Sequence, residues 1–492
     1  MKLEKIIRDS GCTIIEGNGQ TDICAVCSDS RQVTYGSLFV AVKGFAGDGH
    51  DYIPMALGKG ARAVVYEDAE ALDRLRPALD LEGIALIKTE SSRHSLAVIA
   101  SNFHDRPSEK LILVGITGTN GKTTTATLLH RLFTAAGYSC GLLSTIANYV
   151  GDKGTEAVNT TSDPLTINSL LAEMVNAGCG YCFMEVSSIG VEQERITGLK
   201  FKAGIFSNLT HDHLDYHKTF PEYLRCKKLF FDKLPSDAYA ITNIDDRNGM
   251  VMVQNCRAKV VTYSLRGIAD HTCRIIEQSF EGMLLKMDGR EFWSTLIGMH
   301  NAYNLLAIYS TAVTLGADPE EALVAMSALK AAPGRLENLR GPKDISVIID
   351  YAHTPDALEN VLKTLKAIAP DRELVCLFGC GGDRDRAKRP EMGAIAQKYA
   401  TRIIVTADNS RTERTADIMA DIKSGMDISG RARSLFIEDR EEAIRTAILT
   451  AGQGATILLA GKGHETYQIT GNEKRHFSEK EIVEETFSTL SL

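Results

Sequence analysis

The sequence predicts an α/β protein of three domains, the last of them a Rossmann-like, doubly wound domain. Its length of 492 residues corresponds to about three domains of roughly 100–200 residues each. From residue 111 onwards, apolar runs of strand length alternate with amphipathic helical stretches, which is typical of parallel sheets covered by helices. The alternation breaks near residues 332–334 and then restarts, so two such units follow one another.

The first predicted domain spans residues 1–108 and mixes short apolar runs with turn signals, ending in a predicted linker at residues 104–107. The second domain, residues 109–334, has strand-like runs at 111–117, 181–186, 203–209 and 238–244 and a long helical stretch at 300–316. The third domain, residues 335–492, has strand-like runs at 345–352, 373–380, 402–409 and 455–463. In such sheets ligands bind beyond the carboxyl ends of the strands.

Composition and charge narrow the class of protein. Hydrophobic residues make up 44% of the chain and charged residues 24%, which is ordinary for a soluble globular protein. The net charge of −8 argues against a nucleic-acid partner. No signal peptide and no apolar run of about 18 residues is visible, so we expect no membrane span. Eleven scattered cysteines favour reduced thiols in a cytoplasmic protein over a disulfide framework.

A phosphate-binding loop is the strongest local signal. The apolar run at 111–117 leads into a glycine-rich loop at 118–121 and then a helical stretch that stops at Gly137. Glycines let backbone N–H groups turn towards phosphate oxygens, and the helix start adds partial positive charge. Lys122 can reach the β- and γ-phosphates, and the Thr123 hydroxyl can bind Mg²⁺. The sequence therefore predicts a P-loop-type ATPase domain in the centre.

The generic pattern of this loop is incomplete, because Ile116 stands where a glycine is asked for. The alternative is a glycine-rich turn with a surface lysine. The flanking strand and helix favour the phosphate loop, because the motif requires both.

Further along, three segments carry possible metal ligands. Glu185 ends an apolar strand-like run, where a carboxylate suits Mg²⁺ beside a nucleotide. The segment 211–217 contains three histidines and is either a ligand set or a polar loop whose histidines cap a helix. The Lys227-Lys228 pair lies on a predicted amphipathic helix and by itself indicates a solvated face.

Taken together, the motifs resemble those of the Mur ligase family over nearly the full chain. The stretches that carry the resemblance are residues 29–31 with 36–42, 118–124, 159–161, 185–188, 212–215, 350–355, 379–385, 408–411 and 461–465. The resemblance implies domains that bind a UDP-linked substrate, ATP and an amino acid. It implies an ATP-dependent ligase that adds meso-diaminopimelate to a UDP-linked muramyl dipeptide.

The resemblance also implies roles for individual residues. ATP would be bound by Gly118, Thr119, Asn120, Gly121, Lys122, Thr123, Thr124, Asn301, Asn304, Arg335 and Asp350, with Tyr351 nearby. The UDP-linked dipeptide would be bound by Ser28, Ser30, Asn159, Thr160, Thr161, Ser187, Gln193 and Arg195. Mg²⁺ would be held by Thr123, Glu185, His213 and Lys227, the last as a carbamate. Lys122, Glu185, His213, Lys227 and His353 form the expected catalytic set.

Diaminopimelate would be bound by Arg384, Asp408, Asn409, Ser410, Arg411, Gly461 and Glu465. An arginine can bind the far carboxylate of this amino acid through two hydrogen bonds, and Glu465 can take its ammonium group. Lysine-adding relatives usually lack the arginine at position 411. Two positions depart from the family pattern: Ser410 replaces a proline of fixed φ, and Ile189 replaces a histidine whose role is then dispensable or compensated.

The expected reaction phosphorylates the carboxylate of the dipeptide with ATP, and the amine of the amino acid then attacks the acyl phosphate. Four alternatives stay open: the same ligase acting on L-lysine, a folylpolyglutamate-type ligase, a sister ligase that adds a dipeptide, and a nucleotide-binding protein without catalysis. The expected partners are the three small-molecule substrates, and the expected state is a monomer.

Overall fold

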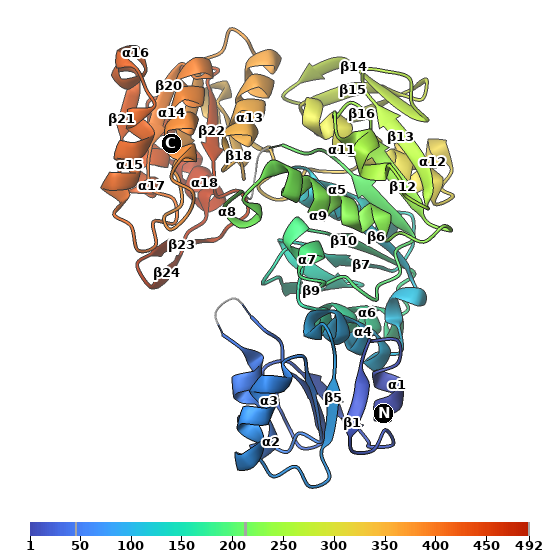
Figure 1. The fold of residues 1–492 in the computed structure, drawn as a ribbon. Coiled ribbons are helices and arrows are strands. Elements are labelled where there is room, and N and C mark those ends of the chain that lie inside the picture. The colour runs from blue at the N-terminus through green and yellow to red at the C-terminus, as the bar shows by residue number, and fades with distance from the viewer. Residues whose placement is uncertain (45–46, 211–213, 491–492) are drawn as a thin grey trace.

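Three sheets follow one another along the chain, and each forms the centre of a separate lobe (Figure 1). The computed structural model describes residues 1–44, 47–210 and 214–490. Helices pack against the three sheets, so the α/β prediction is confirmed.

The first sheet has five strands in the order β1-β5-β4-β3-β2, with β1 antiparallel to its neighbour and the others parallel. Its strands are β1 Thr13–Glu16, β2 Ala25–Cys27, β3 Ser37–Val40, β4 Ala63–Tyr66 and β5 Ala85–Lys88. The helices are α1 Leu3–Ile6, α2 Ile53–Gly58, α3 Ala69–Leu75 and α4 Ser92–Phe103, with 3-10 turns η1 Ser30–Gln32, η2 Gly49–Tyr52 and η3 Arg76–Ala78. Every residue of β3 and β4 is buried, as continuous apolar runs in parallel strands predict.

The central sheet has eleven strands in the order β16-β15-β14-β13-β12-β11-β6-β10-β7-β8-β9. They are β6 Ile112–Thr117, β7 Cys140–Leu143, β8 Ala147–Val150, β9 Lys153–Glu156, β10 Tyr181–Glu185, β11 Ala203–Phe206, β12 Tyr239–Asn243, β13 Lys259–Ser264, β14 His271–Ser279, β15 Gly282–Met287 and β16 Arg290–Ser294. The strands from β13 to β7 run parallel, whereas β14–β16 and β7–β9 form antiparallel extensions at the two ends.

Helices cover both faces of the central sheet. They are α5 Lys122–Ala135, α6 Pro164–Asn176, α7 Ser188–Glu192, α8 Leu214–His217, α9 Phe220–Asp232, α10 Gly249–Val253, α11 Met299–Thr314 and α12 Pro319–Ser327, with η4 Pro107–Glu109 before the first strand. Side chains of β6 alternate between two cores: Val114 packs with α5 and α11, and Leu113 packs with α6 and α9. Gly115 faces the same core as Leu113, where the Phe230 ring fills the place that a side chain would take.

The third sheet has six strands in the order β17-β18-β22-β19-β20-β21, parallel except for β17. They are β17 Glu337–Arg340, β18 Ser346–Asp350, β19 Leu374–Phe378, β20 Arg402–Val405, β21 Ser434–Phe436 and β22 Thr456–Ala460, followed by the hairpin β23 Tyr467–Thr470 and β24 Glu473–His476. The helices are α13 Pro355–Ile368, α14 Lys388–Tyr399, α15 Thr415–Ser424, α16 Ile428–Ala432, α17 Arg440–Leu449 and α18 Glu479–Leu490, with η5 Pro342–Asp344. One core lies under α13–α15 and the other under α17 and α18.

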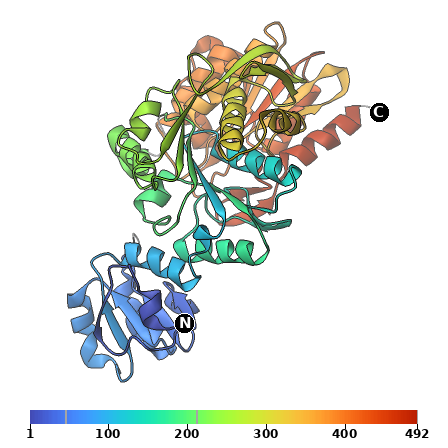
Figure 2. The same ribbon diagram turned by 90° about the vertical axis from the view of Figure 1, so that its right-hand side faces the viewer.

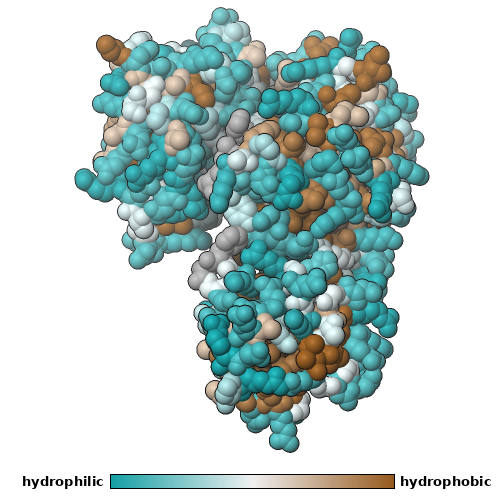
Figure 3. Space-filling view, in the orientation of Figure 1, coloured by the Kyte–Doolittle hydropathy of each residue, from teal (hydrophilic) through white to brown (hydrophobic). Residues whose placement is uncertain are grey.

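The N-terminal lobe is more separate from the rest of the molecule than the other two lobes are from each other. The two views agree that the N-terminal lobe stands apart at one end, joined mainly through α4 and α6, while the other two lobes lie side by side (Figures 1 and 2). The face shown in Figure 3 is mostly hydrophilic, with hydrophobic patches over the central and N-terminal lobes. Among the described helices, none combines the length and apolar character needed to span a bilayer.

Candidate functional site

The loop between β6 and α5 has the geometry of a phosphate-binding site. Gly118 and Gly121 have φ values of 151° and 87°. A side chain at Gly121 would also come within 2.5 Å of the Asn304 Oδ1 atom, so both conformation and space require glycine here. Within the described part of the chain, no side chain caps the start of α5. Its first N–H groups therefore remain suited to phosphate oxygens.

Two residues outside the predicted set hold this loop. Asn208 accepts hydrogen bonds from the N–H groups of Thr119 (2.8 Å, to its carbonyl) and Asn120 (3.0 Å, to its side chain). The Ser207 hydroxyl donates to the Asn120 carbonyl at 2.6 Å. Both residues follow β11, next to β6 in the sheet. The sequence showed an apolar run here but not which strand would lie beside the loop.

Lys122 and Lys227 come together at one carbonyl of the loop. The Lys122 Nζ atom donates to the Gly118 and Thr119 carbonyls at 3.0 and 2.9 Å, and the Lys227 Nζ atom donates to the Gly118 carbonyl at 2.8 Å. Lys227 is 1% exposed, and its Nζ atom lies 4.8 Å from the centre of the Tyr223 ring. The interpretation of this lysine pair as a solvated face is therefore wrong for Lys227.

Two further residues predicted to bind ATP, Asn301 and Asn304, lie on α11, and Asn304 lies against the loop. The Asn304 amide donates to the Asn301 side chain at 3.1 Å, and Asn301 donates to the Ile297 carbonyl at 2.9 Å. Both asparagines are buried. Thr123 and Thr124 are buried in the first turn of α5.

The third lobe reaches the same loop through Arg335. Its guanidinium group donates to the Thr123 hydroxyl at 3.4 Å and lies 4.7 Å from the Tyr351 ring centre. Asp350 is buried beside it and accepts hydrogen bonds from the N–H groups of Leu336 and Ala352, both at 2.8 Å. Burial raises the pKa of Asp350, and the nearby Arg335 partly offsets this. The predicted residues of the second and third lobes thus meet at Thr123.

His353 lies near this junction but is exposed. Its Nδ1 atom is 2.8 Å from the Tyr351 carbonyl, and the Lys388 ammonium donates to the His353 carbonyl at 2.9 Å. His464, outside the predicted set, lies 5.0 Å from the Tyr351 ring. Burial lowers the pKa of His464 to about 4, so this ring is neutral at physiological pH.

Glu185, at the end of β10, is fully buried. Its two carboxylate oxygens accept hydrogen bonds from the N–H (2.8 Å) and hydroxyl (3.2 Å) groups of Thr145. These donors are neutral, so they orient the carboxylate without cancelling its charge. Thr145 lies 40 positions earlier in the chain, and nothing in its own sequence context marked it as a partner.

The residues predicted for the dipeptide gather around Glu185. The Thr161 hydroxyl donates to the Glu185 carbonyl at 3.0 Å and accepts from the Ser187 N–H at 3.0 Å. Arg195 donates to the Thr161 carbonyl at 2.6 Å and to the Gln193 side chain at 2.7 Å. The Thr160 and Thr145 hydroxyl oxygens lie 3.1 Å apart, whereas Asn159 is exposed.

Two groups of predicted residues lie apart from this cluster. Ser28 is exposed and Ser30 is buried, both in the N-terminal lobe, where the Ser30 hydroxyl donates to the Met55 sulfur at 3.2 Å. His213 lies outside the described residues. The contribution of His213 therefore stays a prediction.

The residues predicted for the amino acid gather at the carboxyl ends of β19, β20 and β22. Asp408 and Asn409 are buried, and the Asn409 amide donates to the Glu465 carboxylate at 2.9 Å. Gly461 has a φ of 116°, and a side chain there would come within 2.8 Å of an Asp408 carboxylate oxygen. Arg384 is exposed on the loop after β19. This edge of the sheet is where a doubly wound fold binds ligands.

The loop that carries Ser410 is held in place without a proline. The Ser410 carbonyl accepts from the Glu413 N–H at 3.0 Å, and the Arg411 N–H donates to the Ile469 carbonyl at 3.3 Å. Arg411 has a φ of 50°, and its guanidinium group donates to the Gly382 carbonyl at 2.9 Å. Contacts with the β23–β24 hairpin and with the loop after β19 therefore fix the backbone that a proline would otherwise restrict.

The described donor atoms near the phosphate loop are oxygens of the kind that Mg²⁺ prefers. Among the described residues, no group of three His, Cys, Asp or Glu side chains converges as a zinc site requires. Mg²⁺ in nucleotide sites takes one or two carboxylates with substrate phosphates and waters. Thr123 and Glu185 offer such hard oxygen atoms.

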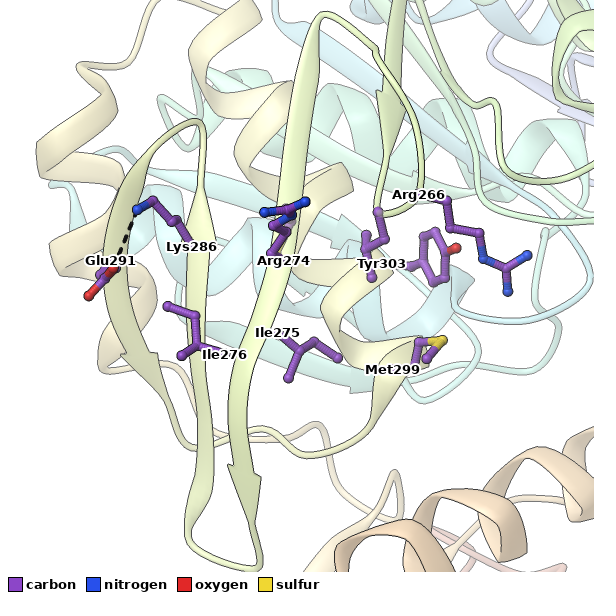
Figure 4. A pocket seen from close by; sticks show the side chains of 10 residues that line it. Arg266, Arg274, Ile275, Ile276, Lys286, Glu291, Met299 and Tyr303 are labelled. Carbon is purple, nitrogen blue, oxygen red and sulfur yellow. Dashed lines mark ion pairs between the residues drawn. The ribbon is translucent and has the colours of Figure 1, made fainter.

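A groove of about 650 Å³ lies on another side of α11, along β14 and β15 (Figure 4). Its lining includes Arg266, Arg274 and Tyr303, and the ion pair of Lys286 with Glu291 (3.5 Å) crosses its rim. Tyr303 donates to the Asp245 carboxylate at 2.9 Å, whereas the next residue, Asn304, faces Gly121. The groove is therefore separated from the phosphate loop by the helix.

Three family models match consecutive parts of the chain. They are "Mur ligase family, catalytic domain" over residues 22–104, "Mur ligase middle domain" over residues 116–312, and "Mur ligase, glutamate ligase domain" over residues 334–463.

Relatives and solved structures agree with these matches. UDP-N-acetylmuramoyl-L-alanyl-D-glutamate–2,6-diaminopimelate ligase of Cytophaga hutchinsonii is 48% identical over 490 residues, which cover 100% of both chains. The enzyme of the same name from Bacteroides fragilis is 47% identical over 489 residues, 99% of each chain. A solved structure with this name has a TM-score of 0.71 at 30% identity and covers 100% of this chain and 99% of that one.

A folylpolyglutamate synthase of Mycobacterium tuberculosis shares the fold. It has a TM-score of 0.59 at 18% identity, and the match covers 74% of this chain and 91% of that one.

Proposed function

This chain belongs to the Mur ligase family, and from that premise we propose that it joins meso-2,6-diaminopimelate to UDP-N-acetylmuramoyl-L-alanyl-D-glutamate at the expense of ATP. Full-length identity of 47–48% to ligases of that name supports the reaction. The observation that carries the choice of amino acid is that Glu465 and Arg411 both contact Asn409: Glu465 accepts from its side-chain amide at 2.9 Å, and the Arg411 guanidinium group donates to its carbonyl at 3.5 Å. The far end of diaminopimelate carries a carboxylate and an ammonium group. Arg411 offers a cation for the carboxylate, and Glu465 offers an anion for the ammonium group.

The proposed reaction has two steps. The free carboxylate of the dipeptide attacks the γ-phosphorus of ATP, the bond to the β-γ bridging oxygen breaks, and an acyl phosphate and ADP result. The amine of the amino acid then attacks the acyl carbon, inorganic phosphate leaves, and the amine loses a proton as the amide forms. Lys122 at the phosphate loop stabilises the negative charge that develops on the phosphoryl oxygens.

The remaining residues bind and orient. The cluster of Thr161, Ser187 and Arg195 would hold the dipeptide beside Glu185. Arg335 brings the third lobe, which carries the amino acid, against Thr123. Such positioning turns a reaction between separate molecules into one within a complex. His353 remains a candidate to assist deprotonation of the amine.

Mg²⁺ would be held by Thr123, Glu185, His213 and a carbamate on Lys227. When bound, it supplies positive charge beside the phosphoryl oxygens. Burial of the Lys227 amine supports the carbamate, because a buried ammonium group is costly and CO₂ converts the amine into an anionic oxygen ligand.

Protein equilibrated with ¹³C-bicarbonate is expected to show a carbamate carbon signal that disappears in the Lys227→Arg variant. Lys228→Arg is the matched control, because this neighbouring lysine pairs with Asp232 instead. A carbamate signal that persists in Lys227→Arg would place the modification elsewhere, and its absence from the unsubstituted protein would remove Lys227 from the metal site.

Each lobe would then bind one substrate: residues 1–108 the UDP-linked substrate, residues 109–334 ATP, and residues 335–492 the amino acid. We further propose that the enzyme acts as a monomer in the cytoplasm.

The test is ADP release with ATP, Mg²⁺ and the UDP-linked dipeptide, with meso-diaminopimelate or L-lysine offered in parallel. We expect turnover with meso-diaminopimelate. Preference for lysine would keep the ligase and overturn the role of Arg411. No turnover with either, but turnover with a folate substrate and glutamate, would favour the folylpolyglutamate-type alternative.

Arg411→Met is expected to raise the KM for meso-diaminopimelate by about 10-fold to 100-fold, because hydrogen bonds to a charged group contribute about 1.5–3 kcal/mol. The KM values for ATP and the dipeptide should stay close to those of the unsubstituted enzyme. Arg414→Met is a matched control three positions later, at the start of α15. Equal losses for all three substrates would indicate a disturbed loop instead.

A further inference from the structure

We propose that Lys462 is a positioning residue that fixes Glu465 and Asn409 for the far ammonium group of the amino-acid substrate. The inference rests on the proposed function, because it concerns the same substrate. Lys462 would not touch the reacting atoms. It would set the direction and the charge of the side chains that receive the ammonium group.

Lys462 is fully buried among the residues predicted for the amino acid. Its Nζ atom lies 3.0 Å from the Glu465 Oε2 atom, 3.3 Å from the Asn409 Oδ1 atom and 4.0 Å from the Asp408 Oδ1 atom. The Asn409 amide donates to the same Glu465 oxygen at 2.9 Å. One carboxylate oxygen of Glu465 is thus fixed by two donors, and in this proposal the other, Oε1, accepts from the ammonium group.

The backbone explains why Lys462 can reach Glu465. The Glu465 N–H donates to the Lys462 carbonyl at 3.0 Å, which closes a tight turn after β22. Gly461 and Gly463 in this turn have φ values of 116° and 54°. On the other side, the Tyr467 and Phe477 ring centres lie 5.6 and 5.8 Å from the Lys462 Nζ atom. The amine is therefore confined between two aromatic rings and three polar side chains.

Charge complementarity supports the same role. Asp408 and Glu465 bring two negative charges to this edge of the sheet, and Lys462 cancels one of them. One negative charge then remains for the substrate ammonium group, while Arg411 is left for the substrate carboxylate. Burial acts to raise the pKa of Asp408, but Arg440, Lys462 and the Asn409 N–H hold that pKa below its ordinary value. Asp408 therefore stays ionised although it is buried.

The test is a double-mutant cycle on the full chain with Lys462→Met, Glu465→Gln and the double variant. We expect Lys462→Met to raise the KM for meso-diaminopimelate by about 10-fold to 100-fold, the range for a lost hydrogen bond to a charged group. The KM for ATP should change little. In the Glu465→Gln background, Lys462→Met should have a much smaller effect, because its partner is already neutral.

Lys474→Met is the matched control. Its exposed Nζ atom lies 4.0 Å from the centre of the same Tyr467 ring, on the β23–β24 hairpin. This variant should leave the KM for meso-diaminopimelate unchanged. If Lys462→Met fails to fold, the cycle is run with Lys462→Gln, which keeps a donor without the charge.

Three results would overturn the proposal: an unchanged KM for meso-diaminopimelate, the same KM increase in both backgrounds, or parallel losses for all substrates with a lower melting temperature. Failure of the proposed function has a different signature. In that case the unsubstituted enzyme itself would not turn over meso-diaminopimelate.

Discussion

Replacement of Lys122 by alanine is expected to lower kcat for ligation by about 10³-fold, the loss associated with removing one group that stabilises transition-state charge. The Lys122 Nζ atom donates hydrogen bonds to the Gly118 and Thr119 carbonyls, in the loop expected to hold the β- and γ-phosphates. ADP release under saturating substrates measures the effect. Because Lys122 is expected to stabilise charge that moves towards the leaving ADP in the transition state, and not to bind the amino acid, kcat should fall more than the KM for diaminopimelate rises.

Lys153→Ala controls for loss of a lysine, since this residue is exposed on the distant strand β9. Melting curves without nucleotide test whether the loop survives the loss of two hydrogen bonds from Lys122. If Lys122→Ala retains full ligation and a normal melting temperature, phosphoryl transfer does not occur at this loop.

Much of this site could be predicted because its signals are local. A strand, a glycine loop and a helix start within residues 112–123 predict where phosphates bind, since the backbone geometry follows from the residues themselves. The run at 408–411 likewise places charged groups at a strand end. The resemblance to the Mur ligase family then supplied roles that spacing alone does not give, such as a carbamate on Lys227.

The remainder depends on contacts between distant parts of the chain. Thr145 orients Glu185 only because β7 lies beside β10, and Asn208 holds the loop only because β11 lies beside β6. The bare sequence indicated a solvated face for Lys227. In the structure, α9 packs this lysine inward against the phosphate loop, a contact that the sequence of α9 alone does not show. The antiparallel strands β14–β16 were also missed, since their pattern did not interrupt the alternation enough to mark them.

The role proposed for Lys462 could not be predicted from the sequence either. It lies within the 461–465 stretch that carried the resemblance, yet only its neighbours Gly461 and Glu465 were predicted to bind the amino acid. Two of the residues that surround it are far from it in the sequence. Asn409 lies 53 positions before it, and Phe477 follows the β23–β24 hairpin. Such a role becomes visible only when three strand ends are brought together.

The largest expected effect on stability comes from Arg440, which is fully buried in α17. Its guanidinium group donates to the Glu479 carboxylate at 2.9 Å and to the Ala407 and Ala460 carbonyls at 3.0 and 2.8 Å. Arg440→Met is expected to destabilise the third lobe by about 3–5 kcal/mol, because it leaves a buried carboxylate without its counter-charge. Arg445→Met on the same helix breaks two partly exposed ion pairs, with Glu441 and Glu485, and should cost only about 0.2–1 kcal/mol for each.

Hydrogen exchange of peptides from β20 and β22 measures the effect locally, and peptides around the single tryptophan, Trp293 in β16, serve as an internal reference in the central lobe. Equal exchange in Arg440→Met and Arg445→Met would contradict the prediction.

The pH dependence of Arg440→Met should identify the cause of its instability. Burial already raises the pKa of Glu479, and Arg440 is the main group that offsets this, so its removal raises the pKa further. A carboxyl group whose pKa is higher in the folded state costs stability as pH rises through that pKa. The deficit should therefore be larger at pH 8 than at pH 5, and a deficit independent of pH would point to lost packing instead.

The position of Arg440 also connects stability with function. Ala407 and Ala460, whose carbonyls it binds, directly precede Asp408 and Gly461 in the proposed amino-acid site. One buried side chain thus holds together the two strand ends between which that site is formed. Combining Arg440→Met with Glu479→Leu removes both charges and should restore much of the stability. The KM for meso-diaminopimelate should nevertheless stay raised in the double variant, because no group then ties the two carbonyls together.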